Sequence, residues 1–219
     1  MKYDYVFFDL DGTLTQSEFS IIESAKYALG ELGYEVVDEE ALKAFIGPPL
    51  YYSFHNIAML PEEEATEAVR LYREYYEAGA YKNTPVYEGI DRTLSLLKDA
   101  GCVLAVVTGK VAYMAKEVLE HTGLLSYFAG VFGPTPEQKL PEKEDLIRFA
   151  MEALQVPEGS NVLMVGDRHF DIEGAVAVGI DSAGVLYGYG SKEELTEAGA
   201  TYLAYFPQEL LSIVSGTEA

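Results

Sequence analysis

The fold is decided by one stretch near the N-terminus, Tyr5-Val6-Phe7-Phe8-Asp9-Leu10-Asp11-Gly12-Thr13-Leu14. Its first four residues are β-branched or aromatic, which predicts a buried strand. Two carboxylates at the end of a buried strand need a compensating charge, because burial and mutual repulsion both oppose their ionisation. A divalent cation supplies that charge most simply, and Gly12 permits a tight turn after the acids. The stretch therefore predicts a metal-dependent site at the carboxyl end of a strand.

The composition bounds the class of protein. The chain has 219 residues, 49% of them hydrophobic, and a formal net charge of −21. That charge argues against a nucleic-acid polymer as partner, and a small anionic substrate would need cations placed locally. The single cysteine, Cys102, excludes an intrachain disulfide. We find no basic-apolar leader and no apolar stretch approaching ~20 residues, so we expect a cytoplasmic protein without a membrane span, as a monomer or weak dimer.

Short apolar runs alternate with amphipathic helical patterns through the second half of the chain. The runs predict strands at residues 103–107, 128–132, 161–165, 181–185 and 201–205. Helical patterns lie at residues 87–100, 110–122 and 141–155. Such alternation is typical of an α/β fold, so we predict a doubly wound parallel sheet with helices on both faces.

The segment between the first strand and this region breaks the pattern, because it holds no convincing strand. Helical patterns cover residues 16–32 and 61–78, and Asp38 is a candidate cap for a short helix between them. We therefore expect an α/β core domain made of residues 1–14 and 84–219, with an all-helical cap domain at residues 15–83. A helical block placed directly after the site strand is well placed to close as a lid.

Polar residues follow three of the predicted strands. Besides Asp9 and Asp11, the strand at 103–107 leads into Thr108, and the strand at 161–165 leads into Asp167. In open α/β sheets, ligands bind outside the carboxyl ends of the strands, so these four side chains should converge on one crevice. Each signal alone also has a structural explanation as a turn or a helix cap; their order along the chain favours a catalytic site.

Four motifs of this chain resemble those of the haloacid-dehalogenase-like superfamily of phosphohydrolases. They are residues 9–14, Thr108, a lysine before the fourth motif, and residues 166–171. The resemblance covers essentially the whole chain, including the helical cap. Residues 45–50 and 184–191 are also similar to bacterial proteins described as phosphoglycolate phosphatase-like, some of whose relatives are described as 5′-nucleotidases.

The resemblance implies a Mg²⁺-dependent phosphatase that forms an aspartyl-phosphate on Asp9. It implies that Mg²⁺ is held by the Asp9 carboxylate, the Asp11 backbone carbonyl and Asp167. Asp11 would act as general acid and then as general base. Asp171 would orient Lys143 or the water shell of the metal.

The remaining implied residues bind the substrate. Thr108 and the Gly109 amide would hydrogen-bond the transferring phosphoryl group, and Lys143 would stabilise its charge. Gly109 stands where the family often has Asn or Ser, which removes a side-chain contact but keeps the amide. Lys110 and the cap residues Gly47 and Pro48 complete the predicted substrate-binding set.

Several alternatives stay open at this point. Lys139 is the second candidate for the lysine of the third motif. A phosphomutase of the β-phosphoglucomutase type would need cations in the cap for a second phosphate, and the candidates are Lys26, Lys43, Arg70 and Arg73. A dehalogenase leaves Asp11 and Asp167 unexplained, and a catalytically silent binding or regulatory protein predicts a lost nucleophile or metal ligand. Phosphoglycolate, nucleoside monophosphates, pyrophosphate and sugar phosphates remain candidate substrates, because the cap selects by shape.

Overall fold

The core of the protein is one parallel sheet. The computed structural model describes residues 1–35, 38–138, 140 and 142–217. Its strands are β1 (Tyr5–Phe8), β2 (Val103–Val107), β3 (Gly130–Phe132), β4 (Val162–Gly166), β5 (Asp181–Val185) and β6 (Tyr202–Ala204). They pair in the order β3-β2-β1-β4-β5-β6, and every pairing is parallel. The doubly wound α/β sheet predicted from the sequence is confirmed.

The register brings three strand ends to the same level. Phe8, the last residue of β1, pairs with Val106 of β2 on one side and with Val165 of β4 on the other. The strand order reverses between β1 and β4, which is where open α/β sheets place their ligands. The segments that follow β1, β2 and β4 therefore share one edge of the sheet.

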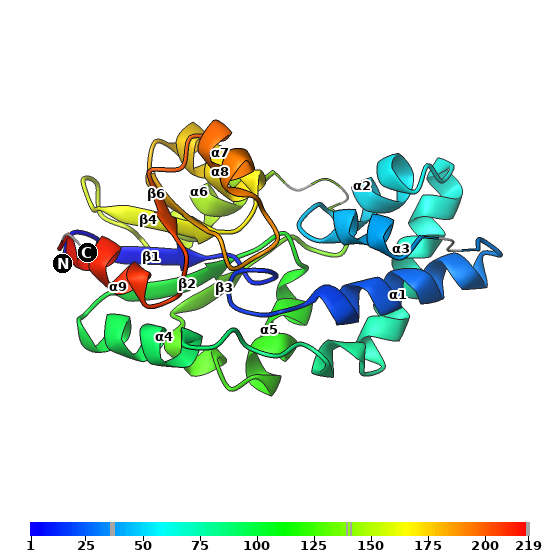
Figure 1. Cartoon of the computed structure of the whole chain (residues 1–219), viewed down its shortest axis with the longest axis horizontal. Helices are drawn as coiled ribbons and strands as arrows, with labels where there is room; N and C mark the ends of the chain where they lie inside the picture. Colours follow the sequence, from blue (N-terminus) through cyan, green and yellow to red (C-terminus); the bar gives the residue numbers. More distant parts are fainter. Residues whose placement is uncertain (36–37, 139, 141, 218–219) are drawn as a thin grey trace.

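Helices cover both faces of the sheet (Figure 1). One face carries α4 (Ile90–Asp99), α5 (Ala112–His121) and α9 (Glu209–Ser215), and the other carries α6 (Lys143–Ala153), α7 (His169–Val178) and α8 (Lys192–Glu197). Alternation along β1 divides its side chains between two cores: Val6 and Phe8 pack into the cluster that includes α4, α5 and α9, and Phe7 packs with α6 and α7. A short 3₁₀ turn, η4 (Leu125–Tyr127), precedes β3.

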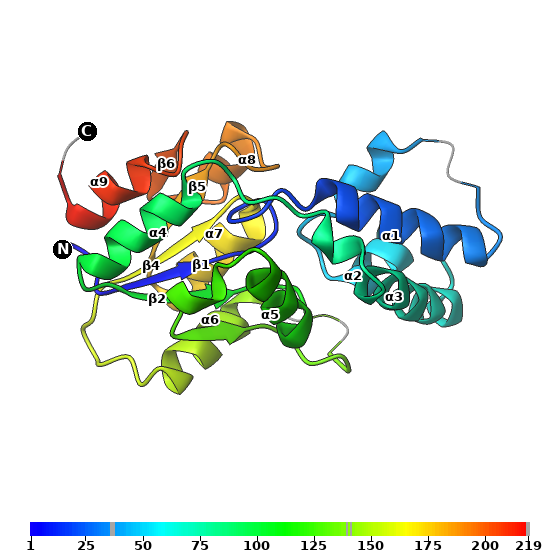
Figure 2. The same cartoon turned by 90° about the horizontal axis from the view of Figure 1, so that it is seen from below.

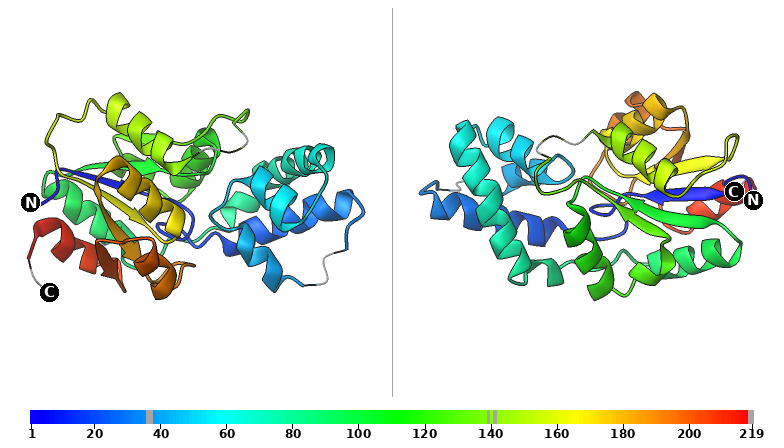
Figure 3. Two further views of the ribbon diagram at one scale, coloured as in Figure 1. Left: turned by 90° about the horizontal axis from the view of Figure 1, so that it is seen from above. Right: turned by 180° about the vertical axis from the view of Figure 1, so that it is seen from behind.

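We call residues 15–83 the cap segment, and the regular elements among its described residues, 15–35 and 38–83, are helical. They contain α1 (Glu18–Glu31), η1 (Glu40–Phe45), α2 (Leu50–Tyr52), η2 (Ser53–Ile57), α3 (Glu62–Glu77) and η3 (Ala80–Lys82). These elements lie beyond the carboxyl ends of the strands, as Figure 3 shows from two sides. The helix α3 buries Ala65, Tyr72 and Tyr76 along one stripe. We keep the division into domains at residues 14 and 84 as our proposal.

Two adjacent backbone connections join the cap segment to the sheet (Figure 2). Thr15 pairs with Val86 in an antiparallel bridge. The Gln16 amide donates to the Pro85 carbonyl over 2.8 Å, and the Tyr87 amide donates to the Leu14 carbonyl over 3.1 Å. The outgoing and returning chains therefore support each other at the base of the cap segment.

The observed helices and strands differ from the predicted ones mainly in the residues at which they begin and end, and several short elements were not predicted. The helix predicted at residues 87–100 begins at Ile90, because Gly89 has a φ of +90° and breaks the turn. The helix predicted at 141–155 begins at Lys143, with residue 141 outside the described residues. The described part of the chain contains no helix with the length and apolar character needed to cross a membrane.

Candidate active site

Asp9 leaves the sheet beside the end of β4. Its backbone amide donates to the Val165 carbonyl over 2.9 Å, which continues the β1–β4 pairing by one residue. Gly12 then turns the chain with a φ of +85°, and a Cβ at that position would lie 2.2 Å from Oδ2 of Asp167. Only glycine allows the loop after β1 to approach Asp167 so closely. The turn thus brings the first and fourth motifs into direct contact.

Lys143 contacts residues of the first and the fourth motifs. As the first residue of α6, it places Nζ 2.8 Å from Oδ1 of Asp9 and 2.6 Å from Oδ1 of Asp171. The same Nζ donates to the Val107 carbonyl over 2.9 Å. Burial opposes its charge, but the carboxylates of Asp171 and Asp9 raise the pKa of Lys143 above its usual value. Lys139, the other candidate, lies outside the described residues.

Burial shifts the pKa values of the two acids at the strand ends. It is the main cause that raises the pKa of Asp9 to about 7, with Lys143 acting in the opposite direction and Asp171 adding to the rise. Burial also raises the pKa of Asp167 well above its usual value, and the neighbouring Asp171 and Asp9 add to that shift. Perturbed carboxylates grouped in a cleft are typical of a functional site.

The buried acids fit a divalent cation. Carboxylate oxygens of Asp9, Asp167 and Asp171 lie within 4.8 Å of one another. Asp171 forms an ion pair with Lys143 through Oδ1 and accepts from the backbone amide of Arg168 through Oδ2. Asp9 and Asp167 directly follow β1 and β4, where the strand order reverses, so they are the two carboxylates best placed to ligate. Hard oxygen donors in this number suit Mg²⁺, which keeps several waters.

The carboxylate of Asp11 has different surroundings. Its Oδ2 lies 2.8 Å from Nζ of Lys110, and both side chains are about nine-tenths buried. The Lys110 ammonium also lies 4.7 Å from the ring centre of Tyr76, a residue of α3. Among the described residues, Oδ1 of Asp11 has no hydrogen-bond partner although it is buried. Asp11 therefore stands beside the acid cluster with one oxygen left for a ligand.

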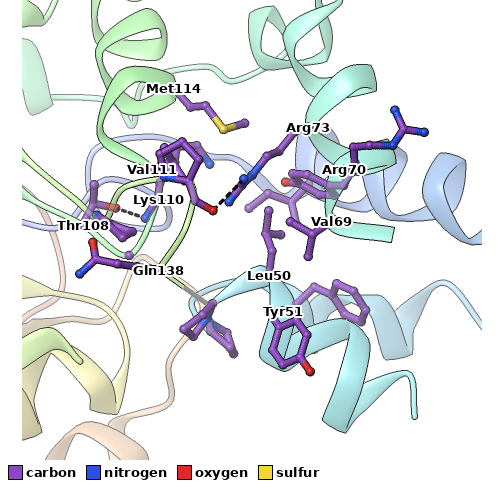
Figure 4. Close-up of a pocket in the computed structure, with 18 of the residues that line it drawn as sticks. Leu50, Tyr51, Val69, Arg70, Arg73, Thr108, Lys110, Val111, Met114 and Gln138 are labelled. Carbon is purple, nitrogen blue, oxygen red and sulfur yellow. Dashed lines mark hydrogen bonds between the residues drawn. The ribbon is translucent and has the colours of Figure 1, made fainter. Parts of the chain in front are cut away.

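A cavity of about 720 Å³ lies between the cap segment and these residues. Figure 4 shows Thr108, Lys110 and Gln138 on one side of it and Leu50, Tyr51 and Val69 across from them. The core residues Asp9, Asp11, Thr108, Gly109 and Lys110 all line the cavity, as do the cap residues Gly47 and Pro48. The predicted substrate-binding residues other than Lys143 are thus brought together around one space, and Lys143 lines a second cavity that shares Gly47 and Pro49 with it.

Further contacts at this edge were not predicted from the sequence. The backbone amide of Tyr189 donates to Oδ2 of Asp167 over 2.8 Å, and a Cβ at Gly188 would lie 2.3 Å from Cβ of Asp167. The glycines within residues 184–191 are the sequence signal for this close approach. Arg73 of α3 donates to the Pro136 carbonyl over 3.1 Å (Figure 4), a contact for which the sequence holds no signal.

Three curated relatives share most of this chain. The 5′-nucleotidase of Pseudomonas aeruginosa is 37% identical over 196 residues, which are 89% of this chain and 88% of that protein. The tyrosine-protein kinase PtkA of Mycobacterium tuberculosis is 34% identical over 91% of this chain and 68% of its own length. The phosphoglycolate phosphatase of Vibrio parahaemolyticus is 32% identical, with 95% of this chain and 94% of that protein covered.

The fold agrees with these relatives. A crystal structure described as a predicted phosphatase from Clostridium acetobutylicum superposes with a TM-score of 0.93 at 42% identity, covering 99% of this chain and 100% of that one. The family model described as haloacid dehalogenase-like hydrolase matches residues 6–185, which span all four motifs. The resemblance to phosphatases expected from the sequence is confirmed, and the chain belongs to the haloacid dehalogenase-like hydrolase family.

Proposed function

We propose that the chain is a Mg²⁺-dependent phosphatase that hydrolyses a small phosphomonoester through an aspartyl-phosphate on Asp9. One observation carries the proposal: the two acids of the first motif have separate partners at the base of one cavity. Asp9 faces Lys143 at 2.8 Å, whereas Asp11 faces Lys110 at 2.8 Å. Separate partners allow one carboxylate to act as nucleophile and the other to move protons.

In the first step, a carboxylate oxygen of Asp9 attacks phosphorus and the bond to the leaving oxygen breaks. Asp11 gives its proton to that oxygen, which leaves as an alcohol. In the second step, Asp11 takes a proton from water, whose oxygen attacks phosphorus and releases phosphate from Asp9. Lys143, the Thr108 hydroxyl and the Gly109 amide stabilise the charge on the transferring group in both steps.

Asp9, Asp167 and the backbone carbonyl of Asp11 would hold Mg²⁺. When bound, the cation offsets the repulsion between the nucleophile and the phosphate dianion. The protein residues around it fix the ligands: Thr13 donates its hydroxyl to Oδ1 of Asp167 over 3.2 Å, and the Tyr189 amide holds Oδ2.

The charges around the cavity favour a leaving group that carries no negative charge of its own. The part of the cavity that the cap segment lines carries the acids Glu67, Glu74 and Glu77 and the bases Arg70 and Arg73. Glu137 of the core also lines the cavity. Four carboxylates outnumber two guanidinium groups, which disfavours a carboxylate-bearing alcohol such as glycolate. The volume suits a nucleoside or a sugar, so we propose nucleoside monophosphates or sugar phosphates as better substrates than phosphoglycolate.

A phosphomutase fits less well, because three of the four cations considered for a second phosphate are paired with carboxylates, and only Arg73, which donates to the Pro136 carbonyl, lines the cavity without such a pair among the described residues. Lys26 pairs with Glu23 and Glu39, and Lys43 pairs with Glu18 and Glu40. Arg70 pairs with Glu67 and Glu74, both of which line the cavity. These carboxylates would repel a second phosphate. The relative named a tyrosine-protein kinase favours, as the second candidate, transfer from Asp9 to an acceptor other than water.

An assay of phosphate release distinguishes these alternatives. We expect the purified protein to release phosphate from p-nitrophenyl phosphate with Mg²⁺ and not after chelation, and Asp9→Asn to abolish the release. A panel of nucleotides, sugar phosphates and phosphoglycolate, with phosphate and alcohol measured together, should give equal amounts of both products. Turnover without metal, an active Asp9→Asn variant, or alcohol release without phosphate would reject hydrolysis through Asp9.

A further inference from the structure

The side chain of Arg168, from the core, contacts a loop of the cap segment that lines the cavity. Nη1 of Arg168 donates to the backbone carbonyl of Ile46 over 2.6 Å. Ile46 begins the cap loop, defined here as residues 46–49, and its other three residues line the cavity. Arg168 directly follows Asp167 in the chain. Arg168, which is adjacent in the chain to one of the clustered acids, therefore forms a hydrogen bond to the loop that lines the cavity.

The other side of the guanidinium is fixed within the core. Nε of Arg168 lies 2.8 Å from Oε1 of Glu194 on α8. The same carboxylate oxygen accepts from the His169 amide over 2.9 Å, and Ser191 caps the first turn of α8. Partial burial acts against the charge of Glu194, but the hydrogen bonds from Arg168 and His169 lower its pKa to about 2. Glu194 is thus negatively charged, and its ion pair with Arg168 orients the guanidinium toward the cap loop.

Gly47 shows how closely the two parts fit. Its φ is +106°, and a Cβ there would lie 3.1 Å from Cγ and 3.4 Å from Nη1 of Arg168. A Cβ at Gly109 of the second motif would lie 3.6 Å from the Gly47 carbonyl oxygen. The cap loop therefore approaches both the second motif and Arg168 closely.

We propose that Arg168 is a positioning residue that holds the cap loop in its closed place over the leaving group, with Glu194 as its anchor. A guanidinium reaches a carboxylate and a carbonyl at once because its donors form a rigid fork, which an ammonium group does not reproduce. The effect on turnover rests on the proposed phosphatase function, whereas the effect on the loop itself does not.

Hydrogen–deuterium exchange tests the position of the loop without any substrate. Arg168→Met keeps the length of the side chain and removes both contacts. Arg148→Met is the matched control. Arg148 also contacts one carboxylate, that of Glu144, and one backbone carbonyl, that of Ala177, but neither contact involves the cap segment. We expect exchange in residues 45–50 to rise about tenfold in Arg168→Met and to stay unchanged in Arg148→Met. Equal exchange in the two variants would overturn the proposal.

Kinetics separate positioning from general damage. We expect Arg168→Met to raise KM for p-nitrophenyl phosphate about tenfold, and KM for acetyl phosphate, whose leaving group is small, less than about twofold. Arg168→Lys should recover only part of the loss. An equal loss with both substrates would assign Arg168 to the acid cluster and overturn its role at the loop. A wild-type protein that releases no phosphate rejects the proposed function, and the exchange experiment still decides the role of Arg168.

Gly47→Ala approaches the same contact from the cap side. Its Cβ would push against Arg168 of the fourth motif, and its φ of +106° also disfavours alanine, so Gly47→Ala should raise KM at least as much as Arg168→Met does. In the double variant the two effects should not multiply, because each removes the same contact. Independent, multiplying effects would contradict the proposal.

Discussion

Two acids separated by one residue have different partners, and our proposal assigns them different tasks on that basis. Asp9 lies against Lys143 and close to Asp167 and Asp171, and Asp11 lies against Lys110. The sequence predicted both acids at one cleft, and alternation along an extended chain is sufficient for that. It did not predict the Lys110 partner, because Lys110 and Asp11 are 99 residues apart in the chain. Contacts between distant loops follow from the sheet order rather than from a local pattern.

Lys143 should be the lysine of the third motif, because its Nζ lies 2.8 Å from Oδ1 of Asp9. We expect Lys143→Ala to lower kcat by about 10²–10³-fold, the usual effect of removing a donor from the transferring charge. Lys139→Ala should change kcat less than about twofold. The two variants compared by phosphate release decide the assignment, and the opposite order would transfer the role to Lys139.

The raised pKa of Asp9 predicts a pH dependence of metal binding. In the metal-free protein the pKa of Asp9 is about 7, against an ordinary value of 3.8, mainly because of burial. Between these two pKa values, the folded state keeps a proton on Asp9 that the unfolded state has lost. The protonated Asp9 therefore favours the folded state at low pH, and this contribution is lost as the pH rises through about 7. Mg²⁺ must displace that proton.

The rise in Tm on adding Mg²⁺ should therefore be larger at about pH 8 than at about pH 6. Thermal unfolding followed by circular dichroism measures it. Asp9→Asn is the control, and it should lose most of the difference between the two pH values. A larger rise at the lower pH in the wild-type protein would show that the Asp9 proton does not compete with the metal.

At the scale of elements, the strands were easier to predict than the helices. β1, β2 and β5 have the predicted residues, because a short buried strand is a continuous apolar or small-residue run between polar ends. α7 was not predicted as an element, since it carries apolar residues on all sides and shows no amphipathic period. η2 was missed because it is a short π-helical turn that continues α2. The contact of Arg168 with Ile46 spans 122 residues and has no sequence signal.

The turn after β1 depends on Gly12. We expect Gly12→Ala to destabilise the fold by about 2 kcal/mol and to weaken activation by Mg²⁺, because its Cβ would collide with Asp167 and its φ of +85° disfavours alanine. Gly30→Ala is the control: it lies in α1 with nothing within 4 Å of a Cβ, so it should stabilise the helix by about 0.5–1 kcal/mol. Urea unfolding of both variants checks this, and equal changes would show that the turn tolerates a side chain.

At the scale of the whole molecule, charge opposes compactness. Asp and Glu number 36 against 15 Lys and Arg, which gives the net charge of −21. Most ion pairs of the cap segment are exposed and contribute little, so they do not offset this repulsion. The net charge was readable from the sequence. The grouping of carboxylates around the cavity was not, because it depends on how α3 packs over the sheet.

Salt should consequently stabilise the protein. We expect Tm to rise as NaCl increases from low concentration to about 0.5 M, because screening weakens the repulsion among the surface carboxylates. Differential scanning calorimetry measures the change, with KCl as a check that the effect is not specific to sodium. A fall in Tm over this range would mean that attractive surface pairs outweigh the repulsion.

Peptide mass spectrometry of an acid-quenched reaction shows whether Asp9 carries the phosphoryl group. Asp11→Asn lacks the base for the second step, so incubation with Mg²⁺ and acetyl phosphate should leave the mass of one phosphoryl group on the peptide that contains Asp9. The double variant Asp9→Asn/Asp11→Asn should carry none. A phosphoryl group on a different residue, or the same labelling in the double variant, would contradict the account.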